Sequence, residues 1–237
     1  MQKSENLTSA YQLGIYGAIS TIIGILLSGP LGLVVVSQLA PQPAWQNAQV
    51  FAENLHWLQS TPYFAGFFLV GGYVVMLAAM YQVAEEKDKT RALVAVVFTA
   101  AFAALIFFNY IVQTTFVPTL ARNYRPENEP IIAALSMANS KSLAWAIELW
   151  GYGFLGVATW FAAPVLRGSR LGNITAVLFV LNGVVSVITA IWAAVGLGWV
   201  LTPVGVANYA IWNLLVLVMS ILVVLVFQGR KKGSEDF

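Results

Sequence analysis

The stretch SLAWAIELWGYGFLGVATWFAAPVL, residues 142–166, decides the fold because it is a long apolar run with one charged residue, Glu148. A helix of about 20 apolar residues spans the hydrocarbon core of a bilayer, so this run predicts a transmembrane helix. A charge at the centre of such a helix costs about 3 kcal/mol. Glu148 is therefore the first candidate for a functional residue.

The composition extends this interpretation to the whole chain. Of its 237 residues, 59% are hydrophobic and only 9% are charged, and the mean hydropathy is +0.77. Soluble domains carry roughly 25% charged residues, so these residues cannot cover a water-exposed surface. The sequence predicts an all-α integral membrane protein whose main partner is the lipid bilayer. No cluster of Lys and Arg with interleaved aromatic residues suggests a nucleic-acid partner.

Two residue types limit the chemistry. The chain has no cysteine and one histidine, His56. Disulfides and thiolate metal sites are therefore excluded, as are histidine-rich iron centres and bis-histidine haem sites. We expect neither a metal site nor a cofactor, and we expect His56 to be an interfacial side chain rather than a ligand or base.

Six apolar segments are long enough to cross the membrane, and we expect them to form one bundle and a single membrane domain. The first is too long for the apolar core of a secretory signal, which favours an uncleaved helix over cleavage near Ala40. Gly29 and Pro30 lie inside it and predict a kink or an early end. The predicted spans are 11–37, 63–83, 92–120, 142–166, 173–195 and 204–227.

Two long connections carry features of short helices. In residues 38–61, apolar side chains recur every three or four positions, which predicts an amphipathic helix in the membrane interface. In residues 121–141, Pro130 precedes a short apolar run and predicts a helix with proline in its first turn. The charged residues 85–91 are expected to form a solvated turn between the second and third spans. The recurring apolar residues of the first connection are Trp45, Ala48, Phe51, Leu55 and Leu58.

The positions of the basic residues predict the orientation. Of twelve Lys and Arg, only Arg122, Arg125 and Lys141 lie in the two long connections. The others flank the chain ends and the short turns, and the positive-inside rule places that side in the cytoplasm. The protein is thus expected in the cell membrane, with both termini cytoplasmic and both long connections outside.

Polar residues inside the spans are spaced in pairs. Residues four apart share one face of a helix, and the predicted orientation puts each pair in the outer half of its span. We expect the pairs to converge on an outward-open pocket that binds a small polar solute or cation, or passes a proton. Desolvation there would favour a neutral carboxyl and so suit proton exchange. The pairs are Asn109 with Gln113, Glu148 with Tyr152, and Tyr209 with Asn213.

A structural role is the alternative for these residues. Glu148 lies about 9 Å along the helix from Ser142, so it is able to pair with Lys141, Arg122 or Arg125 near the interface. The amides are able to join helices, for about 0.6 kcal/mol each. The glycines of residues 151–156 match a GxGxxG dinucleotide motif, but no strand precedes them, so they indicate close helix packing.

Three functions fit the pattern. The first is a small carrier or channel-like protein with the site at Glu148. The second is a membrane-embedded enzyme acting on a lipid or isoprenoid, with Glu148 and Tyr152 as acid–base groups. That reaction needs a second acid from a loop, such as Glu53, Glu127 or Glu129. The third is a non-catalytic sensor or assembly component. A single intramembrane acid favours binding over catalysis.

Overall fold

The computed structural model describes residues 2–235, and in that part of the chain the secondary structure is helical, with no strands. Six helical segments there are long and apolar enough to cross a membrane, which confirms the all-α, six-helix fold class. The segments are Glu5–Leu39, Trp57–Val83, Glu86–Arg122, Leu143–Leu166, Arg170–Val195 and Pro203–Gly233.

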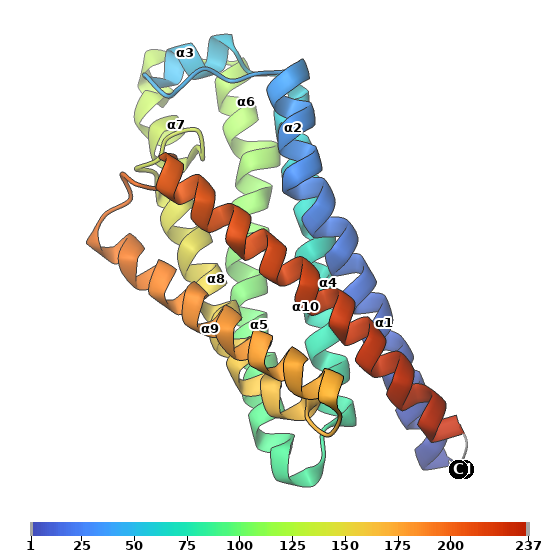
Figure 1. The fold of residues 1–237 in the computed structure, drawn as a ribbon. Helices are drawn as coiled ribbons and strands as arrows, with labels where there is room; N and C mark the ends of the chain where they lie inside the picture. Colours follow the sequence, from blue (N-terminus) through green and yellow to red (C-terminus); the bar gives the residue numbers. More distant parts are fainter. Residues whose placement is uncertain (1, 236–237) are drawn as a thin grey trace.

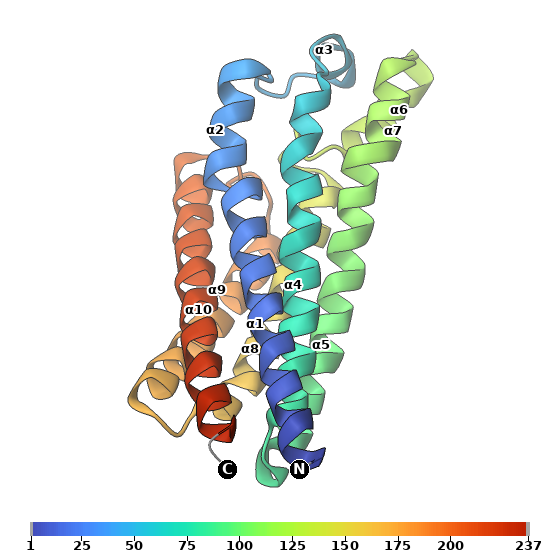
Figure 2. The same cartoon turned by 90° about the vertical axis from the view of Figure 1, so that its right-hand side faces the viewer.

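The long helices close into a ring in which each packs against two neighbours. In order around the ring they are α1 (Gln2–Ser28), α4 (Thr61–Val83), α5 (Glu86–Ile111), α8 (Leu143–Ala162), α9 (Arg170–Val195) and α10 (Pro203–Glu235). The ring closes where α10 returns to α1. The start of α1 and the end of α10 lie at one end of the bundle, here named the terminal end, and α3 and α7 cover the opposite loop end (Figures 1 and 2).

Glycines let neighbouring helices approach closely. A Cβ added to Gly156 of α8 would lie 2.7 Å from Cβ of Ser186 and 3.0 Å from the carbonyl oxygen of Gly183, both on α9. Contacts this short leave no room for a side chain, as at other small-residue membrane interfaces. The glycines of residues 151–156 therefore serve helix packing.

The first span is broken in the way its sequence predicts. Helix α1 ends at Ser28, and α2 (Pro30–Leu39) begins directly after Gly29. Pro30 has no amide hydrogen to donate to the preceding turn, so the helix cannot continue regularly through it. At its other end α1 starts at Gln2, so it extends well beyond the predicted first residue of the span.

The third span differs from the expectation at both ends. Helix α5 begins at Glu86, so most of the charged segment 85–91 belongs to its first turns instead of a loop. Glu86 and Asp88 lie in the first turn, where acidic side chains interact favourably with the helix dipole. The span then passes through a π-helical turn, η2 (Val112–Phe116), into α6 (Val117–Arg122).

The π-helical turn has a local cause. Pro118 has no amide hydrogen for the carbonyl of Thr114, which would be its partner in a regular α-helix. The amide of Val117 instead donates to the carbonyl of Val112, five residues back. This wider turn contains Gln113 and changes the direction in which the side chains around it point.

Short helices cover the loop end, as expected, but the first is shorter than its apolar pattern suggests. Asn47 caps α3 (Ala48–Glu53), which ends before Leu55, and a separate 3₁₀ turn, η1 (Trp57–Ser60), follows. The second connection forms η3 (Pro126–Asn128) and α7 (Glu129–Leu135), with Pro130 in the first turn as predicted. Ala48 and Phe51 pack in a small apolar cluster with Val117, Ala121 and Ile132.

The remaining turns are at the terminal end. Helix α8 finishes in a 3₁₀ turn, η4 (Ala163–Leu166). Ser169 caps α9 by accepting a hydrogen bond from the amide of Gly172, so the cap precedes Asn173, the expected start of the span. Arg230 of α10 donates to the carbonyl oxygens of Val165, Leu166 and Arg167, at 2.8, 2.7 and 2.6 Å.

Candidate functional site

Glu148 lies inside the bundle, near the loop end of α8. The side-chain oxygen of Ser142 caps this helix by accepting from the amide of Trp145. The Glu148 residue is only 8% exposed. Its Oε2 accepts a hydrogen bond of 2.8 Å from Nδ2 of Asn109, and its Oε1 accepts one of 3.2 Å from the hydroxyl of Tyr110. Both donors are uncharged and both come from α5.

Gln113 fixes the orientation of Asn109. Its Nε2 donates to Oδ1 of Asn109 at 3.2 Å and to the carbonyl of Leu135 at 2.8 Å, and its Oε1 accepts from the amide of Met137 at 3.1 Å. Because Oδ1 of Asn109 is occupied in this way, its amide nitrogen must face Glu148. The π-helical turn thus connects the loop after α7 to the carboxylate.

Tyrosines from four helices surround the carboxylate. The hydroxyls of Tyr110 and Tyr152 are 3.0 Å apart, and since Tyr110 uses its proton on Glu148, Tyr152 donates to Tyr110. Tyr63 of α4 and Tyr209 of α10 lie in the neighbourhood of Glu148, without a described hydrogen bond to its carboxylate. The ring centroids of Tyr63 and Tyr110 are 5.6 Å apart.

Asn213 is placed differently from the expectation. Its Nδ2 donates to the backbone carbonyl of Tyr209 at 2.8 Å, and its Oδ1 is buried without a hydrogen-bond partner among residues 2–235. A Cβ on Gly29 would lie 2.3 Å from this Oδ1, so Asn213 faces the break between α1 and α2. No hydrogen bond described in the structure joins Asn213 or the Tyr209 hydroxyl to the Glu148 carboxylate.

Four of the six predicted site residues therefore form one hydrogen-bonded group: Asn109, Gln113, Glu148 and Tyr152. Tyr209 lies near it, and Asn213 belongs to a neighbouring contact. Tyr110, which links Glu148 to Tyr152, was not predicted. The signal in the sequence that could have identified it was its position directly after Asn109 and three residues before Gln113. Whether these residues form a functional site stays a prediction.

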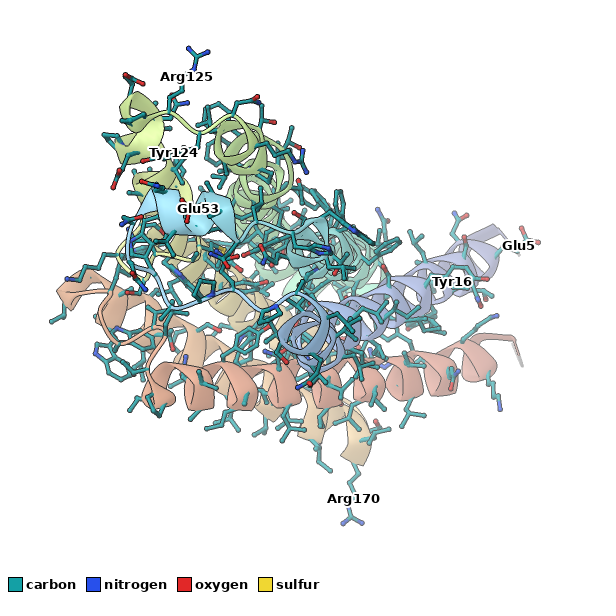
Figure 3. The ribbon with its side chains drawn as sticks, turned by 90° about the horizontal axis from the view of Figure 1, so that it is seen from above. Glu5, Tyr16, Glu53, Tyr124, Arg125 and Arg170 are labelled. Atoms are coloured by element: carbon teal, nitrogen blue, oxygen red, sulfur yellow. The ribbon has the colours of Figure 1, made fainter. Side chains whose placement is uncertain are left out.

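Among the described side chains, Glu148 forms no ion pair. The salt bridges found there join Lys87 to Glu85 and Arg91 to Asp88, both in the turn before α5 and its first residues. Arg125, one of the expected partners, points away from the bundle (Figure 3). The carboxylate is therefore held by neutral donors alone.

The loop acids do not supply a second carboxylate hydrogen-bonded to this group. Oε2 of Glu129 accepts from the hydroxyl of Tyr124 at 2.9 Å, and Oε1 of Glu53 accepts from Nε2 of Gln49, also at 2.9 Å. Within residues 2–235, no group of three or more His, Asp or Glu side chains is placed to hold a metal ion.

The geometry limits what this site is able to do. A carboxyl buried in an apolar bundle without a counter-charge is stable when it carries a proton or receives a cation from outside. The two donors leave further acceptor capacity on both carboxylate oxygens. The arrangement therefore suits reversible binding of a proton or a cation.

Comparison with known proteins identifies no matching family model, no matching curated protein and no matching solved structure.

Proposed function

We propose that this multi-pass membrane protein binds a small polar solute, specifically a cation, at Glu148, and that the carboxyl gives up its proton when the solute binds. The observation that carries the proposal is a buried carboxylate whose hydrogen-bond donors, Asn109 and Tyr110, are both neutral. Exchange of a proton for a monovalent cation leaves the carboxyl site electrically neutral in both the protonated and the cation-bound state.

Transport is the function that such exchange serves best. The break at Gly29 divides one membrane-spanning helix, and discontinuous helices are common beside the binding sites of carriers. Asn213 of α10 faces this break, while Tyr209, one turn earlier, lies near Glu148. A movement of α2 relative to α10 would therefore act on the turn of α10 that carries both Tyr209 and Asn213.

The proposal includes an orientation in the cell membrane. The start of α1, the end of α10 and the short α4–α5 and α8–α9 turns lie at the terminal end (Figure 2). Most Lys and Arg residues are at that end, and the positive-inside rule assigns it to the cytoplasm. The loop end, with Glu148 in the nearer half of α8, then faces outward.

The test is proton release on cation binding, measured with a pH indicator on the purified protein in weakly buffered detergent. Glu148→Gln keeps the shape of the side chain and one acceptor oxygen but removes the exchangeable proton. We expect the wild type and the exposed-site control Glu127→Gln to release protons when a cation that binds the protein is added. Glu148→Gln should release none. Equal release by Glu148→Gln and the wild type would refute the proposal.

A further inference from the structure

Two pairs of aromatic rings lie next to the hydrogen-bonded group of Glu148. The ring centroids of Tyr63 and Tyr110 are 5.6 Å apart, and those of Tyr152 and Trp212 are 4.4 Å apart. The Tyr110 and Tyr152 hydroxyls, 3.0 Å apart, join the two ring pairs. These rings come from α4, α5, α8 and α10, and the Tyr110 hydroxyl connects them to the carboxylate.

The atoms around Glu148 suit one class of cation better than another. Inorganic divalent cations take six or more oxygen ligands, commonly from several carboxylates, whereas Glu148 is the acidic residue in this hydrogen-bonded group. Alkylated ammonium ions are held by aromatic faces together with a negative charge, as in the aromatic cages that bind choline and methyl-lysine. One carboxylate balances one positive charge.

The site also has partly exposed aromatic side chains and an unused donor. Tyr209 is 38% exposed and Tyr63 and Tyr152 are half-buried, whereas Glu148 is only 8% exposed, so a solute reaches Glu148 when these side chains move aside. Nε1 of Trp212 is buried and has no hydrogen-bond partner in the described part of the chain. A polar substituent on the solute would satisfy this donor.

From this juxtaposition we infer that the solute is an organic ammonium monocation, bound with its charge at Glu148 and its alkyl groups against Tyr63, Tyr110, Tyr152 and Trp212. The inference rests on the proposed function and names its substrate class. The inference predicts that the protein binds organic ammonium monocations in preference to inorganic cations and to neutral solutes of the same shape.

The experiment is isothermal titration calorimetry on the purified full chain with three probes: choline, its neutral isostere 3,3-dimethylbutan-1-ol, and potassium ion. We expect saturable binding of choline only, lost in Glu148→Gln. Trp212→Leu should weaken choline binding by about 2- to 30-fold, the range for loss of a cation–π contact. Trp150→Leu is the matched control, since Trp150 is on α8 but 43% exposed, and it should leave the affinity unchanged.

A conservative variant protects the test against misfolding. Trp212→Phe keeps an aromatic face and should recover most of the affinity lost in Trp212→Leu. Circular dichroism shows whether each variant folds. If Trp212→Leu does not, the pair Tyr63→Leu and Tyr63→Phe makes the same comparison.

The possible failures are distinguishable. Binding of potassium that depends on Glu148, without binding of choline, would overturn the substrate class and leave the proposed function intact. Equal binding of the isostere and choline, or choline binding insensitive to loss of the aromatic ring, would also overturn the class. If the binding of neither cation depended on Glu148, both proposals would be wrong.

Discussion

Glu148 and Asn109 show how one side chain orients another at the residue scale. The amide nitrogen of Asn109 faces the carboxylate because Gln113 donates to the other end of the same amide. Gln113 is in turn fixed by the backbone of Leu135 and Met137. The carboxylate is thus oriented by a chain of neutral groups that begins in the loop after α7.

Replacement of Asn109 tests this series of hydrogen bonds. Asn109→Ala removes the donor to one carboxylate oxygen and one of the two acceptors of the Gln113 amide nitrogen, and we expect the free energy of unfolding to fall by about 1–3 kcal/mol. Asn123→Ala is the control, because that exposed side chain donates only to the carbonyl of Thr119 one turn earlier. Thermal unfolding followed by circular dichroism measures both. Equal midpoints of thermal unfolding for the two variants would show that these hydrogen bonds contribute nothing to stability.

The spacing of polar residues predicted part of this network. Asn109 with Gln113 and Glu148 with Tyr152 are each four residues apart, and this fixes a shared helix face without any knowledge of the fold. Tyr110 escaped prediction because it directly follows Asn109 instead of lying four residues from it, so the spacing rule did not select it. The rotation of α10 about its axis is set by its contacts with α1 and α9, so the sequence of α10 alone could not show that Asn213 faces Gly29.

At the scale of elements, Arg230 connects the end of α10 to the end of α8. Its guanidinium donates to three carbonyl groups left free where η4 ends, and its charge lies at the negative end of the helix dipole. Planar guanidinium geometry suits several acceptors at once.

Loss of Arg230 should therefore loosen the terminal end. We expect Arg230→Gln to lower the free energy of unfolding by about 1.5–3 kcal/mol, the range for hydrogen bonds to charged groups. Lys232→Gln, two residues later and exposed, removes the same charge without these contacts. Chemical denaturation in detergent compares them, and an equal loss in both variants would assign the effect to charge alone.

The break between α1 and α2 was predictable from Gly29 and Pro30, whereas its partner on α10 was not. The π-helical turn was also unexpected, although Pro118 supplied its cause in the sequence. Proline signals that a hydrogen bond is missing, and the surrounding packing decides whether the helix kinks, ends or widens. Helix existence was therefore easier to predict than helix bounds.

Gly29 tests the contact at the break. A Cβ there would lie 2.3 Å from Oδ1 of Asn213, so Gly29→Ala should lower the thermal midpoint. Asn213→Ala removes that oxygen, and we expect the double variant to lose less stability than the sum of the two single variants. A double-mutant cycle measures this coupling. Additive effects would mean that the two residues do not meet.

At the scale of the whole molecule, the ring of six helices places the start of α1, the end of α10 and the basic turns at the same end of the bundle. The apolar runs predicted the helices and their number, because an apolar segment of this length has few other stable environments. The order of helices around the ring depends on contacts between distant residues, and local sequence does not contain it.

Because the sequence has no cysteine, single introduced cysteines test the orientation of the protein in the membrane. We expect Asn123→Cys, at the loop end, to react with a membrane-impermeant maleimide in intact cells. Lys87→Cys, at the terminal end, should react only after the membrane is opened. The reverse pattern would place the termini outside and the loop end in the cytoplasm.

The central claim is that the Glu148 carboxyl exchanges its proton for a bound cation, and infrared difference spectroscopy measures that event directly. We predict that choline added to the wild type removes the carbonyl-stretch band of a protonated carboxyl and creates carboxylate bands, and that Glu148→Gln shows neither change. An unchanged wild-type spectrum at saturating choline, or the same bands in Glu148→Gln, would contradict the account.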